Sequence, residues 1–315
     1  MAIIRRYTYR GEEGERIPDE ATHITVGDGV TFVRARAFQC HYNIVEVICH
    51  DKVEKIEHHA FFWCPSLRRV IMPGVKEVEE GAFGWCKALT CIDCGKLEII
   101  GQSAFKLCES LRSINLPSAR IVDREAFYKC TALTDVKFSS KLERVDTMAF
   151  SVCFSLERIT IPLKDSLITC NNIFSWCKKL KHVDIVEKRA MHENATALHL
   201  EEWRYDMKQE IDSIILILPD ARPGNAEFFS ADYDEGEKAR VIQAWIRSVL
   251  LKMIHYQAEH QRVLDEAATT LQFALPRDIV LNNVLPFLEL PSYTCEADDE
   301  DSEDDDIPLA ALRLR

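Results

Sequence analysis

The chain has 315 residues, of which 47% are hydrophobic and 29% charged, a composition typical of a globular protein with a sizeable core. No apolar run reaches the ~18 residues that cross a bilayer, so we expect no membrane insertion. The net charge of −12 is concentrated in residues 296–306, which hold nine acids and no base and leave −3 for the rest. Neither part has the basic surplus of a nucleic-acid-binding protein.

Residues 1–20 are expected to form a separate N-terminal segment. Met1 to Tyr7 lack the apolar stretch of a secretory signal, which favours a cytoplasmic or nuclear location. Residues 21–36 carry spaced aliphatic side chains and are interpreted as a partial unit that covers the first end of a repeat array. The apolar positions of this unit are Ile24, Val26, Val30 and Val33.

A repeat of about 22 residues dominates the sequence from 21 to 187. It is marked by an Ala-Phe pair at six places and by Ile173-Phe174 at a seventh, with the phenylalanines at 38, 61, 83, 105, 127, 150 and 174. Three residues later a cysteine follows in six copies: Cys64, Cys86, Cys108, Cys130, Cys153 and Cys177. The first copy departs, because Cys40 comes two residues after Phe38. Aliphatic or other apolar residues recur six, nine and eleven positions after each phenylalanine.

Each unit is predicted to contribute one short parallel strand, because offsets nine and eleven lie on the same face of a strand. The Ala-Phe-x-x-Cys segment has apolar groups at i, i+1 and i+4 and is expected to form one helical turn. Apolar pairs between units, such as Val53 with Ile56 and Val75 with Val78, predict a second flank. One unit cannot bury these faces alone, so the units are expected to stack into a solenoid.

The pattern A-F-x-x-C-x-x-L, as in Ala82 to Leu89, resembles the BspA-like leucine-rich repeat family. The resemblance covers about residues 21–187. It implies an α/β solenoid with a parallel β ladder that binds macromolecules, and it implies neither a particular partner nor catalysis.

An α-helical cap is expected over residues 188–292. Apolar residues at steps of three and four predict one helix from Leu200 to Leu218 and a second from Asp234 to about Ala274, arranged as a hairpin. A short third helix is expected at 275–288, whose opening Leu275-Pro276-Arg277-Asp278 resembles the first turn of an F-box. Residues 293–315 form an acidic tail, which is expected to be disordered, to contain a phosphorylation site at Ser302, and to suit a basic partner or simply solubility.

The candidate binding surface is the outward side of the ladder, at offsets eight and ten from each phenylalanine. Ile48 and Ile71 are expected to be exposed neighbours beside Arg69, which suits protein binding; ordinary strand-forming residues are the competing interpretation. The full set of predicted partner-binding residues is Glu46, Ile48, Arg69, Ile71, Asp93, Asn115, Asp135, Lys137, Arg158, His182 and Asp184.

No catalytic, cofactor or metal site is expected. The repeated cysteines are interpreted as buried free thiols. Cys91 and Cys94 have the spacing of half a zinc site, but no second pair accompanies them. The sequence therefore favours a non-enzymatic protein-interaction scaffold. A ubiquitin-ligase substrate adaptor using residues 275–288 and a cell-surface adhesin are the alternatives.

Overall fold

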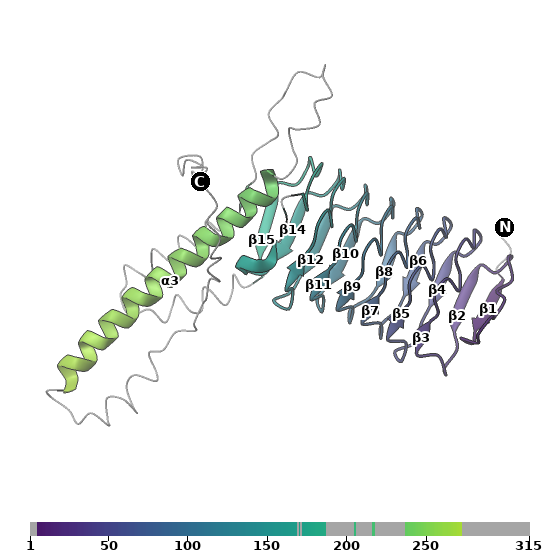
Figure 1. The fold of residues 1–315 in the computed structure, drawn as a ribbon, viewed down its shortest axis with the longest axis horizontal. Helices are drawn as coiled ribbons and strands as arrows, with labels where there is room; N and C mark the ends of the chain where they lie inside the picture. The colour runs from purple at the N-terminus through teal and green to yellow at the C-terminus, as the bar shows by residue number, and fades with distance from the viewer. Residues whose placement is uncertain are drawn as a thin grey trace, which may run out of the picture. The chain divides into compact units, whose positions relative to one another are not determined.

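The computed structural model describes residues 5–168, 170, 172–186, 205, 216–217 and 237–272. They fall into two compact units. The first comprises Met1–Pro162, Ser166–Val186 and Ile217–Gln243, and the second comprises Leu163–Asp165, Glu187–Leu216 and Ala244–Arg315. The first unit is a stack of successive coils whose strands lie side by side (Figure 1).

One flank of the stack is the predicted parallel ladder. Its strands are β1 (Arg6–Tyr9), β2 (His23–Val26), β4 (Glu46–Ile48), β6 (Arg69–Ile71), β8 (Cys91–Asp93), β10 (Ser113–Leu116), β12 (Asp135–Phe138), β14 (Arg158–Ile161) and β15 (His182–Ile185). Offset nine points inward as predicted, because Val47, Val70 and Val136 are buried; the exception is Ile92 on β8, which is only half-buried. The expected solenoid with a parallel ladder is therefore confirmed.

The second flank is a continuous six-stranded sheet in the order β13-β11-β9-β7-β5-β3. Its two-residue strands are β3 (Phe32–Val33), β5 (Lys55–Ile56), β7 (Glu77–Val78), β9 (Ile99–Ile100), β11 (Ile121–Val122) and β13 (Arg144–Val145). The inner residue of each strand is buried, and the predicted pairs Val53 with Ile56 and Val75 with Val78 have no exposed surface.

The recurring phenylalanines form one column through the core. Rings from Phe38 to Phe174 stack on their neighbours at centroid distances of 4.8 to 5.9 Å and are within 13° of parallel. The six repeated cysteines are buried free thiols beside this column. Each coil therefore buries its apolar side only because the next coil covers it.

The predicted helical turn at Ala-Phe-x-x-Cys is wrong, because two residues in the left-handed region flank each Ala-Phe-x triplet. In the second coil these are His59 (φ 55°) and Trp63 (φ 59°). They direct alternate amides to the next coil, so that Phe61 N donates to Ala82 O at 2.7 Å and Trp63 N to Gly84 O at 2.8 Å. Bonding between coils thus replaces the i→i−4 bonds of a helix.

The ladder begins inside the residues 1–20 that the sequence sets apart. β1 pairs in parallel with β2, and Tyr9 is buried edge-on against Phe38, with ring centroids 5.0 Å apart. Tyr9 therefore closes the phenylalanine column at its first end.

The ladder is interrupted between β8 and β10. Over the described strands it forms two sheets, one ordered β1-β2-β4-β6-β8 and the other β10-β12-β14-β15-β16. The second flank and the phenylalanine column continue past this point. The coils therefore stay stacked while one flank is unpaired.

The structure corrects the first predicted C-terminal helix, which cannot reach Leu218. Leu216–Ile217 form strand β16, the neighbour of β15 in the sheet order. The run Ile214 to Leu218 is rich in β-branched residues, so its apolar pattern suits a strand as well as a helix. Residues 200–204 and most of the expected helix lie outside the described residues, as do the third helix and the tail.

The second predicted helix is present as α3 (Glu237–Gln272). Its first turn belongs to the solenoid unit, where Ala239 and Ile242 are buried and the Lys238 amine donates to the carbonyl oxygens of Cys177 and Leu180. These carbonyls belong to the last coil, so Lys238 satisfies acceptors that no further coil can reach. A short 3-10 helix, η1 (Asp165–Leu167), precedes the last coil.

Candidate functional site

Four of the predicted partner-binding residues lie together on β4 and β6. Ile48 and Ile71 are opposite each other in the strand register, as are Glu46 and Arg69. Ile48 is 36% exposed, and Arg69 Nη1 lies 3.6 Å from Glu46 Oε1. We call these four residues the ladder patch; they combine two aliphatic side chains with one ion pair, which is exposed at Arg69 and half-buried at Glu46.

His23 extends the ladder patch, and the sequence reasoning missed it. It is opposite Glu46 in the register, with His23 Nε2 4.0 Å from Glu46 Oε2. Its other ring nitrogen lies 2.9 Å from Thr22 Oγ1. The repeat could have revealed it, because His23 precedes the inward residue Ile24 as Glu46 precedes Val47.

The remaining ladder residues form a separate set beyond the interruption. Arg158 Nη1 lies 2.8 Å from Asp184 Oδ2, and Lys137 Nζ lies 3.9 Å from Asp135 Oδ1. His182 is opposite Arg158 in the register, and Asn115 is opposite Lys137. This half of the ladder presents mutually paired polar groups and no aliphatic pair like Ile48 and Ile71.

Cys91 and Asp93 lie on β8 at the edge of the interruption. Cys91 is exposed, whereas Cys94 is buried, so the two thiols of the C-x-x-C spacing face opposite sides of the strand. Within the described part of the chain, no three His, Cys, Asp or Glu side chains gather as metal ligands would. The cysteine pair is thus unsuited to chelate one ion.

The buried thiols are poor nucleophiles. Burial raises the pKa of Cys49, Cys94 and Cys130 to about 12. A thiolate is the reactive form of cysteine, so these side chains stay protonated and unreactive near neutral pH. Their arrangement supports packing rather than chemistry.

A second exposed group, which the sequence reasoning also missed, consists of Tyr42, Trp63 and Trp85. Their side chains are 52%, 47% and 38% exposed. The Tyr42 and Trp63 ring centroids are 6.2 Å apart, and those of Trp63 and Trp85 are 6.4 Å apart. We call these three residues the aromatic ridge. No single repeat offset contains all three, so only the register between coils brings them together.

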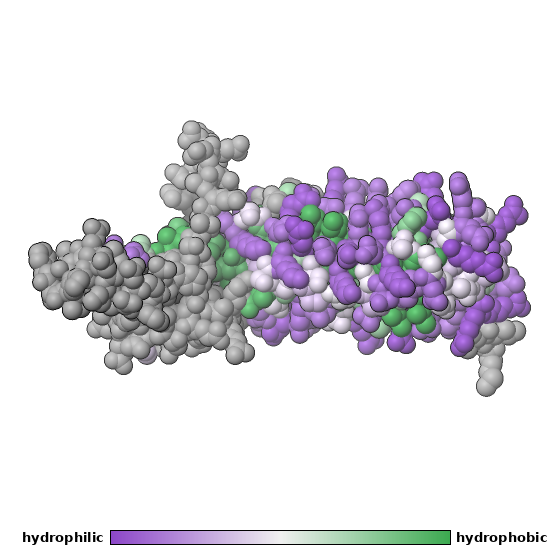
Figure 2. Space-filling model, turned by 90° about the horizontal axis from the view of Figure 1, so that it is seen from below, coloured by the Kyte–Doolittle hydropathy of each residue, from purple (hydrophilic) through white to green (hydrophobic). Residues whose placement is uncertain are grey.

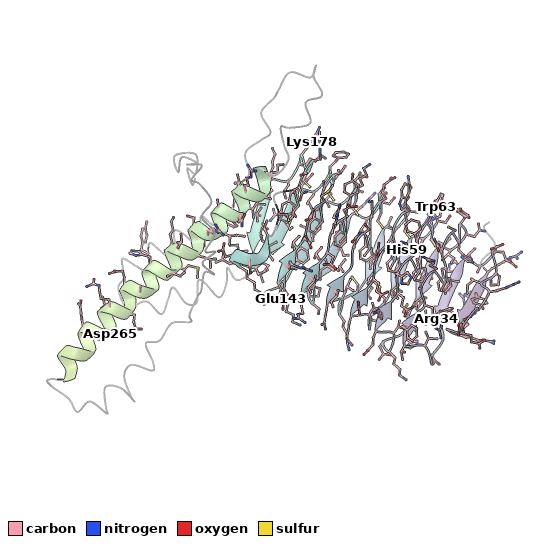
Figure 3. The ribbon with its side chains drawn as sticks, viewed as in Figure 1. Arg34, His59, Trp63, Glu143, Lys178 and Asp265 are labelled. Atoms are coloured by element: carbon pink, nitrogen blue, oxygen red, sulfur yellow. The ribbon has the colours of Figure 1, made fainter. Side chains whose placement is uncertain are left out.

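The aromatic ridge lies on the turn segments rather than on the ladder. Trp63 and Lys178, from distant coils, lie along one edge of the stack, whereas Arg34 and Glu143 lie along the opposite edge (Figure 3). Seen from below, the solenoid surface is dominated by hydrophilic side chains with separate apolar areas (Figure 2). Ion pairs such as Arg120 with Glu143, at 2.9 Å, link neighbouring coils at the second flank.

Known proteins supply the classification. The family model for the BspA type leucine-rich repeat region matches residues 31–120 and 98–196 with six copies, which together cover more than half of the chain. The chain belongs to this family. The match confirms the family prediction from the A-F-x-x-C-x-x-L pattern. Leucine-rich repeat proteins of this kind are generally interaction or surface proteins.

Solved structures with similar folds share only part of the chain. A leucine-rich repeat protein from Bacteroides ovatus is 24% identical over 47% of this chain and 42% of its own, with a TM-score of 0.42. The leucine-rich repeat protein of T. pallidum is 26% identical over 44% of this chain and 78% of its own, with a TM-score of 0.32. This BspA-type chain thus spans less than half of the Bacteroides protein. No curated protein matches it.

Several of the sequence predictions fall on residues that the structure does not describe, and they stay predictions. Ser302, the acidic tail and the F-box-like residues 275–288 lie outside the described residues. Among the helices that are described, none is long and apolar enough to span a bilayer.

Proposed function

We propose that this BspA-type protein is a non-enzymatic scaffold that binds a protein partner through the ladder patch. The observation that supports this most is the register of β4 and β6, which sets Ile48 beside Ile71 and Glu46 beside Arg69. Aliphatic surface next to arginine is typical of protein interfaces, where an apolar centre is surrounded by polar groups.

The rigidity of the patch also suits binding. Val47 and Val70, between the outward residues, are buried in the core, and the two strands are parallel neighbours. A partner therefore meets side chains whose backbone is already fixed. Binding costs little conformational entropy on the side of this surface.

The experiment first identifies the partner and then tests whether Ile71 contributes to its binding. Proximity labelling in the native cell with wild-type protein and with Ile71→Glu should show one or more proteins lost in the variant. With those proteins purified, Ile71→Glu should weaken binding about tenfold or more, because a charge replaces an apolar contact at the centre of the patch.

Thr160→Glu is the matched control, because Thr160 occupies the same offset on β14, beyond the ladder interruption. It should leave binding unchanged. If the folded Ile71→Glu protein keeps every partner of the wild type, or if Thr160→Glu has the same effect, the ladder patch is not the binding surface.

The cellular location belongs to the same proposal. The repeated cysteines are free thiols inside the core, which suits a reducing compartment and supports a cytoplasmic or nuclear location. Imaging of a tagged full-length copy tests this. Finding it on the cell surface would favour the adhesin alternative, and co-purification with a ligase scaffold would favour the adaptor.

A further inference from the structure

Two arginines lie beside the ladder patch, on the positions that directly precede the ladder strands. In three successive coils these positions are occupied by Arg68, Thr90 and Arg112, which come just before β6, β8 and β10. All three residues are exposed. Thr90 N donates to Arg68 O at 3.0 Å, so these two residues are neighbours on adjacent coils. We call Arg68, Thr90 and Arg112 the arginine row.

The charges of the arginine row are not neutralised by the protein. Among the described residues, neither Arg68 nor Arg112 has a carboxylate within ion-pair distance, whereas Arg69 lies 3.6 Å from Glu46. Glu109, which is close to Arg112 in the chain, lies 3.2 Å from Lys87 and is therefore engaged by another cation. Two unpaired positive charges thus face the solvent beside the ladder patch.

The surface between the two arginines carries only short, uncharged side chains. Thr90 and Cys91 in the middle coil and Ser113 next to Arg112 are exposed. Asp93 lies at the other end of β8, opposite Ile71 in the register. Two strand spacings are about 10 Å, a span that long arginine side chains can cover from both sides. Both guanidinium groups can therefore reach one ligand that lies over Thr90.

The arginine row is confined to the part of the ladder that carries the aliphatic pair. In the two coils after Arg112, the same offset holds Thr134 and Glu157, and Glu157 lies 3.9 Å from Lys179. The row is therefore a local feature next to Ile71 and not a basic stripe along the solenoid. A nucleic acid needs a more extended basic surface, and the net charge of −12 repels it.

Carboxylates are the anions that this surface fits best. The guanidinium group is planar and can donate two parallel hydrogen bonds to one carboxylate. An apolar side chain can at the same time pack on the exposed surface of Ile48 and Ile71, which lie opposite each other on β4 and β6. The matching ligand is a polypeptide segment that combines acidic residues with an aliphatic one.

We propose that the partner of the ladder patch presents an acidic segment. Its carboxylates pair with Arg68 and Arg112, and an aliphatic side chain beside them packs on Ile48 and Ile71. This inference rests on the proposed function, because it describes the chemistry of the partner that the ladder patch binds.

The test uses the full chain and hexaglutamate as the probe. The Nε–H signals of the arginines, assigned by single Arg→Ser variants, are followed by NMR as the peptide is added. The signals of Arg68 and Arg112 should shift together and saturate, and about 1 M salt should abolish the shifts because it screens exposed charges. Arg68→Ser and Arg112→Ser should each weaken binding about threefold, and the double variant about tenfold.

A second peptide tests the aliphatic contact. Glu-Glu-Glu-Leu-Glu-Glu-Glu adds one leucine to the same six acids and should bind more tightly than hexaglutamate. Ile71→Ser should remove this gain and leave the binding of hexaglutamate unchanged, because the serine alters no charge.

Arg16→Ser is the matched control. Arg16 is exposed in the loop between β1 and β2, away from the ladder, and its replacement removes the same charge. It should leave the affinity for both peptides unchanged. Arg68 and Arg112 are also exposed, so their serine variants keep the core intact.

Three outcomes overturn the proposal: hexaglutamate causes no saturating shifts, Arg16→Ser weakens binding as much as Arg68→Ser, or decathymidylate binds the arginine row more tightly than either peptide. The last result would assign the row to nucleic acid. If these peptides fail while Ile71→Glu still loses cellular partners, the proposed function stands and only the acidic segment is wrong. If Ile71→Glu keeps every partner and the two peptides bind equally, the proposed function fails as well.

Discussion

At the scale of single residues, the repeated cysteine completes the hydrogen bonding of the phenylalanine column. The carbonyl oxygen of Phe83 accepts from Cys86 N at 3.3 Å and from the Cys108 thiol at 3.3 Å. The same thiol-to-carbonyl contact joins the other coils, from Cys64 with Phe38 to Cys177 with Phe150. Cysteine suits this position because it is small and apolar and still has a weak donor for the second lone pair.

These thiols make stability depend on pH on the alkaline side. Burial raises the pKa of Cys130 from 9.0 to about 12. Between these values the unfolded chain releases a proton that the folded chain keeps, so the free energy of unfolding falls as pH rises. Cys130→Ala should reduce this slope by about 1.4 kcal/mol per pH unit, measured by urea unfolding in reductant between pH 8 and 10.5.

Cys91→Ala, which removes an exposed thiol, is measured in parallel as the control for replacing a cysteine by alanine. An unchanged slope in Cys130→Ala would mean that this thiol ionises equally in the folded and unfolded chains, and that its burial is transient.

The interior residues could be predicted from the sequence because each recurs at a fixed offset with a fixed chemistry. The turn backbone could not. Lys129 and Val152 both adopt left-handed φ values, of 59° and 64°, although neither residue type favours that region. Bonding to the next coil imposes the conformation. The aromatic ridge could not be predicted for a related reason. Tyr42 and Trp63 have different repeat offsets, and only the stacking of the coils brings their rings together.

At the scale of elements, the interruption separates two halves of the ladder that follow the same repeat. Cys91-Ile92-Asp93 and Ser113-Ile114-Asn115 both keep the inward and outward pattern, yet β8 and β10 belong to different sheets. The Phe83 and Phe105 rings at this junction are 5.4 Å apart, within the 4.8 to 5.9 Å range of the whole column. The core therefore gives no sign of the interruption, and the residue types do not reveal it either.

Amide exchange should detect the interruption. Peptides that cover β10 should exchange faster than peptides that cover β12, because β12 pairs with β10 whereas β10 has no ladder partner on the β8 side among the described strands. Hydrogen–deuterium exchange with mass spectrometry measures this. The second flank provides an internal control, since β9, β11 and β13 pair without interruption and should be equally protected. Equal protection of β10 and β12 would show that the ladder closes in solution.

At the scale of the whole solenoid, stability comes from contacts between neighbouring coils, so the position of a lesion decides how far its effect spreads. A coil inside the stack is supported from both sides. The first coil is supported from one side, and its closing contact is Tyr9, which lies edge-on against Phe38 and accepts a hydrogen bond from Arg34 N at 3.2 Å. The two kinds of position should therefore respond differently to loss of a ring.

Removing one ring in the middle and one at the end tests this. Phe105→Ala should lower the free energy of unfolding by about 3–5 kcal/mol and reduce exchange protection in every coil, because Phe105 stacks between Phe83 and Phe127. Tyr9→Ala should open β1 and β2 while coils beyond Phe61 keep their protection. Tyr7→Ala is the control: Tyr7 is on the same strand, but its hydroxyl donates to Glu15 at 2.8 Å and its ring is not part of the column. If Tyr9→Ala unfolds all coils together, the solenoid is a single cooperative unit and nearest-neighbour coupling does not describe it.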